Sequence, residues 1–129
     1  MQTSLGRLID HVHLRVADIE ASRRFYRAVL QAVGRQFTSE SPRHFACDEL
    51  WVDQADGAVS RLHLAFQAHD VETVKAFHVA ALANGGRDNG GPGERPYHPG
   101  YYAAFALDPD GNNIEAVFHG AARTDNSSN

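Results

Sequence analysis

The chain has very little of several features that define large classes of protein. It contains a single cysteine, Cys47, so an internal disulfide is impossible and a reducing compartment such as the cytoplasm is expected. No apolar run approaches the length of a membrane span. The N-terminal residues include no apolar signal region, so export is not expected.

Other absences narrow the possible functions. Lysine and arginine form no dense block and the net charge is -4, so neither nucleic acid nor an anionic membrane is expected as a partner. The sequence has no glycine-rich phosphate loop, no nucleophile elbow and no paired-cysteine zinc motif. Cys47 lies in an extended apolar run and is interpreted as an inert core thiol.

The remaining composition is that of an ordinary globular protein with an excess of histidine. The chain has 129 residues, of which 43% are apolar and 22% are charged, which is typical of one soluble domain with a buried core. Its eight histidines are the count that stands out. We predict a single domain over residues 1–120, followed by a small, polar and flexible tail at 121–129.

An internal repeat accounts for part of the histidine content. Shifting the sequence by 52 residues superimposes eight identical residues within positions 11–35, including His11 on His63 and Asp18 on Asp70. The chain is therefore read as two copies of one unit, called modules here, at about residues 8–56 and 61–119. Two copies are too few for a solenoid.

Each module is predicted to begin with a strand and a helix. Apolar residues alternate with His11, His13 and Arg15 in the first strand, and the second module repeats the pattern around His63. A helix should follow each strand, because Asp18 and Asp70 are short carboxylates suited to cap a helix N-terminus.

Shorter extended runs should complete each module. In the first module they are expected at about 35–40, 43–47 and 50–54. In the second, residues 85–98 read as a loop with at most one short strand, followed by a hairpin of 101–107 and 112–118. The fold class is therefore α+β, two tandem βαβββ modules in which each helix covers the apolar face of its sheet.

Three residues on the opposite, polar faces form a candidate metal site. His11 and His63 occupy equivalent strand positions, and Glu115 points away from the face of its apolar neighbours. Two imidazoles and one carboxylate suit a divalent first-row metal such as Zn, Ni, Mn, Fe or Co, with positions left open for substrate or water. His13 is a competing ligand, but its counterpart Ala65 favours His11 and leaves His13 as a pocket residue.

A second cluster leads into the hairpin that carries Glu115. His98 is a candidate general acid or base, and Tyr101 or Tyr102 a candidate donor to a substrate oxygen; a packed loop with buried tyrosines is an equal alternative. The other candidate pocket residues are Arg15, His44, Trp51, Phe105 and Asn113. No specific role is predicted for His69, His78 or His119.

Two stretches of the sequence carry a family resemblance. Residues 10–26 (DHVHLRVADIEASRRFY) and 108–117 (DPDGNNIEAV) resemble the vicinal oxygen chelate superfamily, which includes glyoxalase I, bleomycin-resistance proteins, fosfomycin-resistance thiol transferases and extradiol dioxygenases. The resemblance spans about residues 8–119. It implies two βαβββ modules that cup a metal in an incomplete mixed β-barrel, with ligands at His11, His63 and Glu115.

The resemblance also implies where the branches of the superfamily differ. The fourth metal ligand of glyoxalase I would fall in residues 49–53, where Trp51 is the inward residue. The dioxygenase signature fits at His98, Asp108 and Glu115, but Phe105 stands at its tyrosine position. The basic anion-binding residues of the fosfomycin-type members are not found.

From these observations we expect a metal-dependent protein that chelates a small oxygen-bearing substrate and stabilises an oxyanion, as a lyase or isomerase does. The alternatives are extradiol-type ring cleavage and metal-free binding of a small molecule, as in drug resistance. The resemblance implies a homodimer. The sequence leaves open whether His11 meets His63 and Glu115 of its own chain or of a second one.

Overall fold

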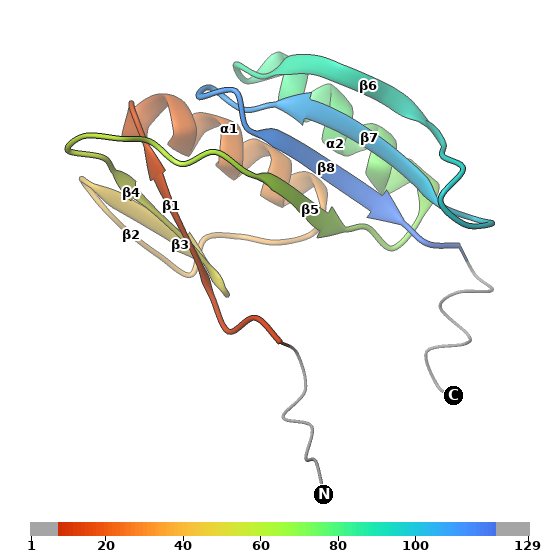
Figure 1. Ribbon diagram of the computed structural model, residues 1–129, viewed down its shortest axis with the longest axis horizontal. Helices are drawn as coiled ribbons and strands as arrows, with labels where there is room; N and C mark the ends of the chain where they lie inside the picture. Colours follow the sequence, from red (N-terminus) through yellow and green to blue (C-terminus); the bar gives the residue numbers. More distant parts are fainter. Residues whose placement is uncertain (1–7, 121–129) are drawn as a thin grey trace, which may run out of the picture.

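The computed structural model describes residues 8–120, which form two four-stranded sheets and two helices (Figure 1). The first module consists of β1 (Val12–Val16), α1 (Ile19–Ala32), β2 (Ser39–Ser41), β3 (His44–Cys47) and β4 (Leu50–Gln54). The second consists of β5 (His63–Gln67), α2 (Val71–Ala83), β6 (Arg87–Glu94), β7 (Tyr102–Leu107) and β8 (Asn113–Phe118). The predicted α+β fold of two βαβββ modules is confirmed, and the sheets form no closed barrel within these residues. The predicted tail, 121–129, lies outside the described residues.

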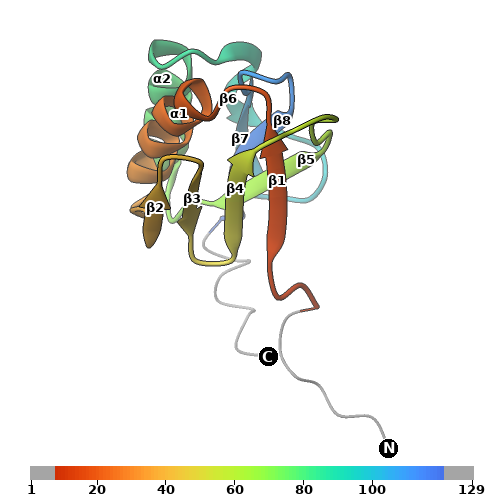
Figure 2. The same cartoon turned by 90° about the vertical axis from the view of Figure 1, so that its left-hand side faces the viewer.

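The two sheets have the same topology. Their strand orders are β1-β4-β3-β2 and β5-β8-β7-β6, and in each the first strand runs parallel to the last strand of its module. Figure 2 shows the first sheet with its strands in this order. β1 and β5 are therefore both edge strands, and neither pairs with a further strand among the described residues.

The helices begin where the capping residues predict. The Asp18 carboxylate accepts hydrogen bonds from the backbone N–H groups of Glu20 and Ala21, and Asp70 accepts one from Thr73. Gly34 follows α1 with φ 86°, a conformation that glycine adopts without steric cost. Neither helix is long and apolar enough to cross a membrane, in the part of the chain that the structure describes.

The helices pack against each other on one side of the sheets, so that both modules share one core (Figure 1). Phe25 and Val29 of α1 and Val74 and Phe77 of α2 are fully buried in this cluster. Burial of apolar side chains of this size stabilises a fold by about 1.5–3 kcal/mol each. The polar faces of both sheets are left available for a site.

One buried hydrogen bond joins the two modules directly. The Tyr26 hydroxyl of α1 donates to Oδ2 of Asp108, in the turn between β7 and β8, at 2.5 Å. Burial and the nearby Asp108 carboxylate raise the pKa of Tyr26 well above its ordinary value. The hydroxyl therefore keeps its proton and remains a donor over the whole neutral range.

The expectation of a loop over residues 85–98 was wrong for its first part. Residues Arg87–Glu94 form the eight-residue strand β6, which pairs antiparallel with β7. The register shifts between Asp88 and Gly90 and again between Gly90 and Gly93. The glycines and the proline that indicate a loop are here the residues of a bulged edge strand, which tolerates them because its outer side needs no partner.

Candidate metal centre and substrate face

The second module brings two of the three predicted metal ligands together. β5 and β8 are parallel neighbours, and Nε2 of His63 lies 2.7 Å from Oε1 of Glu115. The Glu115 side chain is 1% exposed, whereas that of His63 is 52% exposed. A buried carboxylate thus lies behind a histidine that is open to solvent, with their donor atoms in contact.

Tyr101 holds the other oxygen of Glu115. Its hydroxyl donates to Oε2 at 2.5 Å, so the two carboxylate oxygens contact two different side chains. Partial burial and the Glu115 carboxylate raise the pKa of Tyr101 to about 12, and the hydroxyl remains protonated at neutral pH. Of the two predicted tyrosines, Tyr101 is the one beside the candidate ligand.

Tyr102 lies elsewhere, which corrects the prediction that treated it and Tyr101 as equal candidates. It packs against the hydrophobic core as a partly buried residue. It pairs in register with Phe118, three strand positions, an odd number, from the pair Phe105 and Glu115. Because neighbouring strand residues point to opposite faces, Tyr102 faces the helices and not Glu115.

The ring of Tyr101 lies between His98 and the Glu115 carboxylate, because it contacts both. The His98 imidazole packs edge-on against Tyr101, with ring centroids 5.2 Å apart, and its Nε2 lies 3.0 Å from Nδ1 of His119. No role was predicted for His119, which lies beside His98 here. Strand alternation contained the signal, because His119 follows Glu115 by four residues and so continues the same face.

Phe105 and Asn113 flank the pair of candidate ligands. Phe105 is the cross-strand partner of Glu115, and its ring centroid lies 6.1 Å from that of His63. Asn113 is the parallel-strand partner of His63, and its side-chain oxygen accepts a hydrogen bond from Asn89. Both predicted pocket residues therefore lie next to the His63–Glu115 contact.

The polar face of the first sheet carries a network centred on Asp53. Its Oδ1 lies 2.9 Å from Nε2 of His13 and 3.5 Å from Nε of Arg15, and its Oδ2 accepts from the Trp51 indole N–H at 3.4 Å. Partial burial opposes ionisation of Asp53, but the contacts with His13, Trp51 and Arg15 outweigh it and lower its pKa. His13 is thus engaged with a carboxylate.

His11, the third predicted ligand, lies away from the other two. Its side chain is 69% exposed, and its Nδ1 lies 2.8 Å from Oδ1 of the adjacent Asp10. Over residues 8–120, no group of three or more His, Cys, Asp or Glu side chains is placed to hold a metal ion. Within one chain the predicted ligand set is therefore not assembled.

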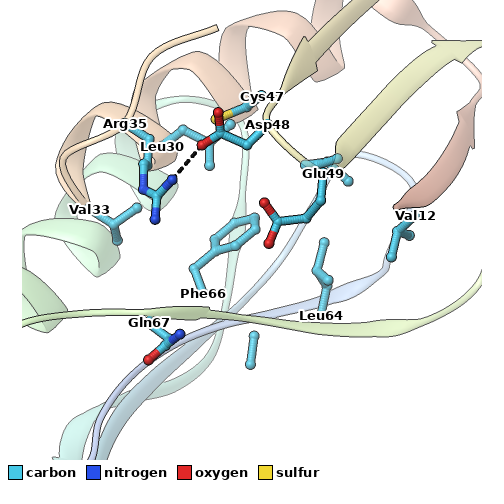
Figure 3. A pocket seen from close by; sticks show the side chains of 12 residues that line it. Val12, Leu30, Val33, Arg35, Cys47, Asp48, Glu49, Leu64, Phe66 and Gln67 are labelled. Atoms are coloured by element: carbon cyan, nitrogen blue, oxygen red, sulfur yellow. Dashed lines mark hydrogen bonds and ion pairs between the residues drawn. The ribbon is translucent and has the colours of Figure 1, made fainter. Parts of the chain in front are cut away.

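A partly open cavity of about 160 Å³ lies between the two modules (Figure 3). Val12, Leu64 and Phe66 form apolar walls, and the Glu49 carboxylate projects over the last two. Arg35 forms an ion pair with Asp48 at its rim. None of the predicted site residues lines this cavity, so cavity shape alone does not locate the candidate site.

A family model described as the Glyoxalase/Bleomycin resistance protein/Dioxygenase superfamily matches residues 8–116. The chain belongs to this superfamily. No curated protein matches the chain.

Solved structures agree with this membership. A glyoxalase/bleomycin resistance protein from Albidiferax ferrireducens T118 is 30% identical, with a TM-score of 0.75 over 87% of this chain and 99% of that one. A lactoylglutathione lyase from Agrobacterium tumefaciens is 24% identical, with a TM-score of 0.64 over 89% of this chain and 96% of that one. An integron cassette protein from the mobile metagenome of V. cholerae is 23% identical, with a TM-score of 0.68 over 93% and 100%. The last two show a likeness of fold.

For a member of the glyoxalase/bleomycin resistance/dioxygenase superfamily, two positions stand out. Phe105 replaces the tyrosine of the dioxygenase signature and lies opposite Glu115, whereas the hydroxyl near Glu115 comes from Tyr101 instead. Trp51 lies on the polar face of β4, beside His13 and Asp53, where the resemblance implies a fourth ligand in glyoxalase I.

Proposed function

We propose that this member of the superfamily is a metal-dependent enzyme of the glyoxalase type, acting as a lyase or isomerase on a small substrate with adjacent oxygens. The observation that carries the proposal is the contact of a buried carboxylate, Glu115, with a solvent-open imidazole, His63, at 2.7 Å. An imidazole and a carboxylate that converge on the polar face of a sheet are ligands that divalent first-row metals accept.

The donor atoms fit a metal ion. Two donors bound at about 2.1 Å to one ion lie roughly 3 Å apart. The 2.7 Å between Nε2 of His63 and Oε1 of Glu115 is close to this separation. The third ligand is His11, and the ion is Zn, Ni, Mn, Fe or Co. As a ligand, His63 would present an unprotonated Nε2 to the metal in place of its contact with Glu115.

His11 is proposed to come from a second protomer of a homodimer. It lies apart from His63 and Glu115 in its own chain, and it directly precedes the edge strand β1. The sheet of the second module also has its first strand, β5, at an edge that is unpaired among the described residues. Leu8, three residues before His11, is 96% exposed, which a single chain leaves unexplained and an interface would cover.

The residues have separate tasks in this proposal. Tyr101 fixes one oxygen of Glu115 and leaves the other for ligation. His98, packed on Tyr101, is the candidate proton carrier, and Phe105 and Asn113 border the substrate. The bound metal supplies Lewis-acid chemistry, which stabilises an oxyanion of a chelated substrate.

Co-expression of two defective variants tests the shared site. His11→Ala and Glu115→Gln each break every site of their own homodimers. In random heterodimers, the His11→Ala chain offers His63 and Glu115 to His11 of the other chain. About a quarter of all sites should therefore be intact, in a closed two-fold dimer of this kind. Metal content after gel filtration and turnover of methylglyoxal–thiol adducts measure this recovery.

Each variant expressed alone is the control, and both should be deficient. A mixture as deficient as its parents, from a wild-type protein that does bind metal, would place the complete site within one chain. Equal affinity for divalent metal in the wild type and in the His63→Ala variant would overturn the metal-dependent function itself.

Removing the Tyr101 hydroxyl should weaken metal binding. Tyr101→Phe leaves Oε2 of Glu115 without its donor, and loss of such supporting contacts typically lowers metal affinity about 10–100-fold. The measurement is the Kd for Zn²⁺ by chelator competition, together with the visible spectrum of the Co²⁺ form. Tyr102→Phe is the matched control, since Tyr102 faces the core, and equal effects of the two changes would contradict the role of Tyr101.

Ring cleavage of the extradiol type is a second candidate, favoured by one observation. Tyr101 brings a tyrosine hydroxyl to Glu115 although Phe105 stands at the signature position. Fe²⁺-loaded protein should then consume O₂ with catechol, and Tyr101→Phe should stop the reaction. Turnover of the thiol adduct with Zn²⁺ or Ni²⁺, and none of catechol with Fe²⁺, would favour the lyase or isomerase.

A further inference from the structure

The strand registers make Trp51 the counterpart of Glu115. In the first module β1 and β4 pair in parallel, with His13 opposite Trp51. In the second β5 and β8 pair in the same way, with Ala65 opposite Glu115. His13 and Ala65 are themselves equivalent in the 52-residue repeat. The two modules therefore present an indole and a carboxylate at the same place on their polar faces.

Trp51 is held in one orientation. The His44 imidazole stacks on it, with ring centroids 4.3 Å apart and planes 13° from parallel. Its indole N–H donates to Asp53, which is fixed in turn by His13. Despite these contacts, Trp51 is 41% exposed. One face of the indole is covered by His44, and much of the rest is open to solvent.

The open side of Trp51 lines a hollow that also contains His11. This hollow has a volume of about 240 Å³, and its walls are formed by His11, His13, Asp48, Glu49 and Trp51. An aromatic surface already fixed by its neighbours binds a flat ligand without loss of side-chain freedom. Trp51 thus lines the same hollow as His11, the candidate metal ligand of the first module.

We propose that this hollow binds a planar, conjugated part of the substrate, which stacks on Trp51 while the adjacent oxygens of the same molecule reach the metal. The proposal rests on the proposed function, because it assigns the substrate class of that site. The proposal follows from the side chain at the position equivalent to Glu115. The second module has a candidate metal ligand there, and the first module has an indole. Stacking of a planar ring on an aromatic side chain should favour planar substrates over saturated ones by about tenfold or more.

Because the chain has one tryptophan, its indole N–H gives a single, unambiguous NMR signal. Zn²⁺-loaded protein is titrated with naphthalene-2,3-diol and with cyclohexane-1,2-diol, which share adjacent oxygens but differ in planarity. The Trp51 signal should shift with the naphthalenediol through its ring current. Trp51→Leu should weaken naphthalenediol binding about tenfold or more and leave cyclohexanediol binding within about twofold, and Trp51→Phe should restore part of the loss.

A parallel titration separates this inference from the metal-dependent function. The metal-free protein is titrated with 2-naphthol, which is planar but has no pair of oxygens to chelate. If 2-naphthol shifts the Trp51 signal and a saturated alcohol at the same concentration does not, stacking is supported even where no metal binds. An unshifted Trp51 signal with both planar probes, or equal weakening of both diols by Trp51→Leu, would overturn the proposal.

Discussion

Glu115→Gln is expected to lower the affinity for divalent metal by about two orders of magnitude or more. Binding free energies of roughly 10–16 kcal/mol for tightly bound Zn²⁺ are shared among very few ligands, so each contributes several kcal/mol. Glutamine keeps the shape of Glu115 but removes the charge of its buried side chain. Chelator competition for Zn²⁺ measures the affinity, and thermal unfolding of the metal-free variant separates loss of a ligand from loss of the fold.

Glu72→Gln is the matched control. Glu72 is an exposed glutamate in the first turn of α2, paired with Lys75 at 3.4 Å, and its replacement should leave metal affinity unchanged. If both variants bind Zn²⁺ as the wild type does, Glu115 is not a ligand and the buried contact with His63 has a structural role.

The largest expected effect on stability comes from Asp108→Ala, at about 3–5 kcal/mol. The Asp108 side chain accepts hydrogen bonds from the Tyr26 hydroxyl at 2.5 Å and from the Asn112 amide at 3.1 Å, and from the backbone N–H groups of Asp110 and Asn112. Asp108 is 1% exposed. Alanine leaves these donors without their acceptor in a buried place, and each such loss costs about 1–3 kcal/mol. Urea unfolding measures the change against Asp56→Ala, an exposed aspartate.

Tyr26→Phe should cost less, about 1–2 kcal/mol, because it removes one of those hydrogen bonds and leaves Asp108 with its other donors. In the double variant the two losses should not add, since both changes remove the same contact. Additive losses would show that Tyr26 and Asp108 stabilise the protein independently.

The same contact predicts a loss of stability at alkaline pH. Burial and the Asp108 carboxylate raise the pKa of Tyr26, so the folded state binds a proton that an unfolded tyrosine releases near pH 10. This stabilisation is complete below about pH 10 and disappears as the pH rises towards the raised pKa. Tyr26→Phe should therefore flatten the decline of the unfolding free energy above pH 10, and an unchanged decline would contradict it.

The sequence predicts the elements of each module well because their signals are local. Asp18 and Asp70 cap the helices, and the strand alternation that identified His63 and Glu115 correctly puts them on one face. The length of β6 was underestimated, because its glycines and Pro92 are residues typical of loops. Its pairing comes from β7, a neighbour that local sequence does not identify.

The contacts between distant parts of the chain were not predictable in the same way. Tyr26 and Asp108 are 82 residues apart, and their contact depends on how α1 packs across both modules. The repeat showed that His11 and His63 are equivalent, but equivalent positions in two modules need not be close together. Whether they meet depends on the arrangement of the sheets, which the packing of α1 against α2 determines.

The outer edges of β1 and β5, which are unpaired within residues 8–120, have a consequence for how the protein must be handled. In the proposed assembly each metal site exists only while two chains are associated, so metal binding and dimerisation are linked by mass action. Dilution should then release metal at a fixed free-metal concentration, and added metal should hold the dimer together at low protein concentration. An assay at nanomolar enzyme would report the dissociation of the subunits as much as the chemistry of the site.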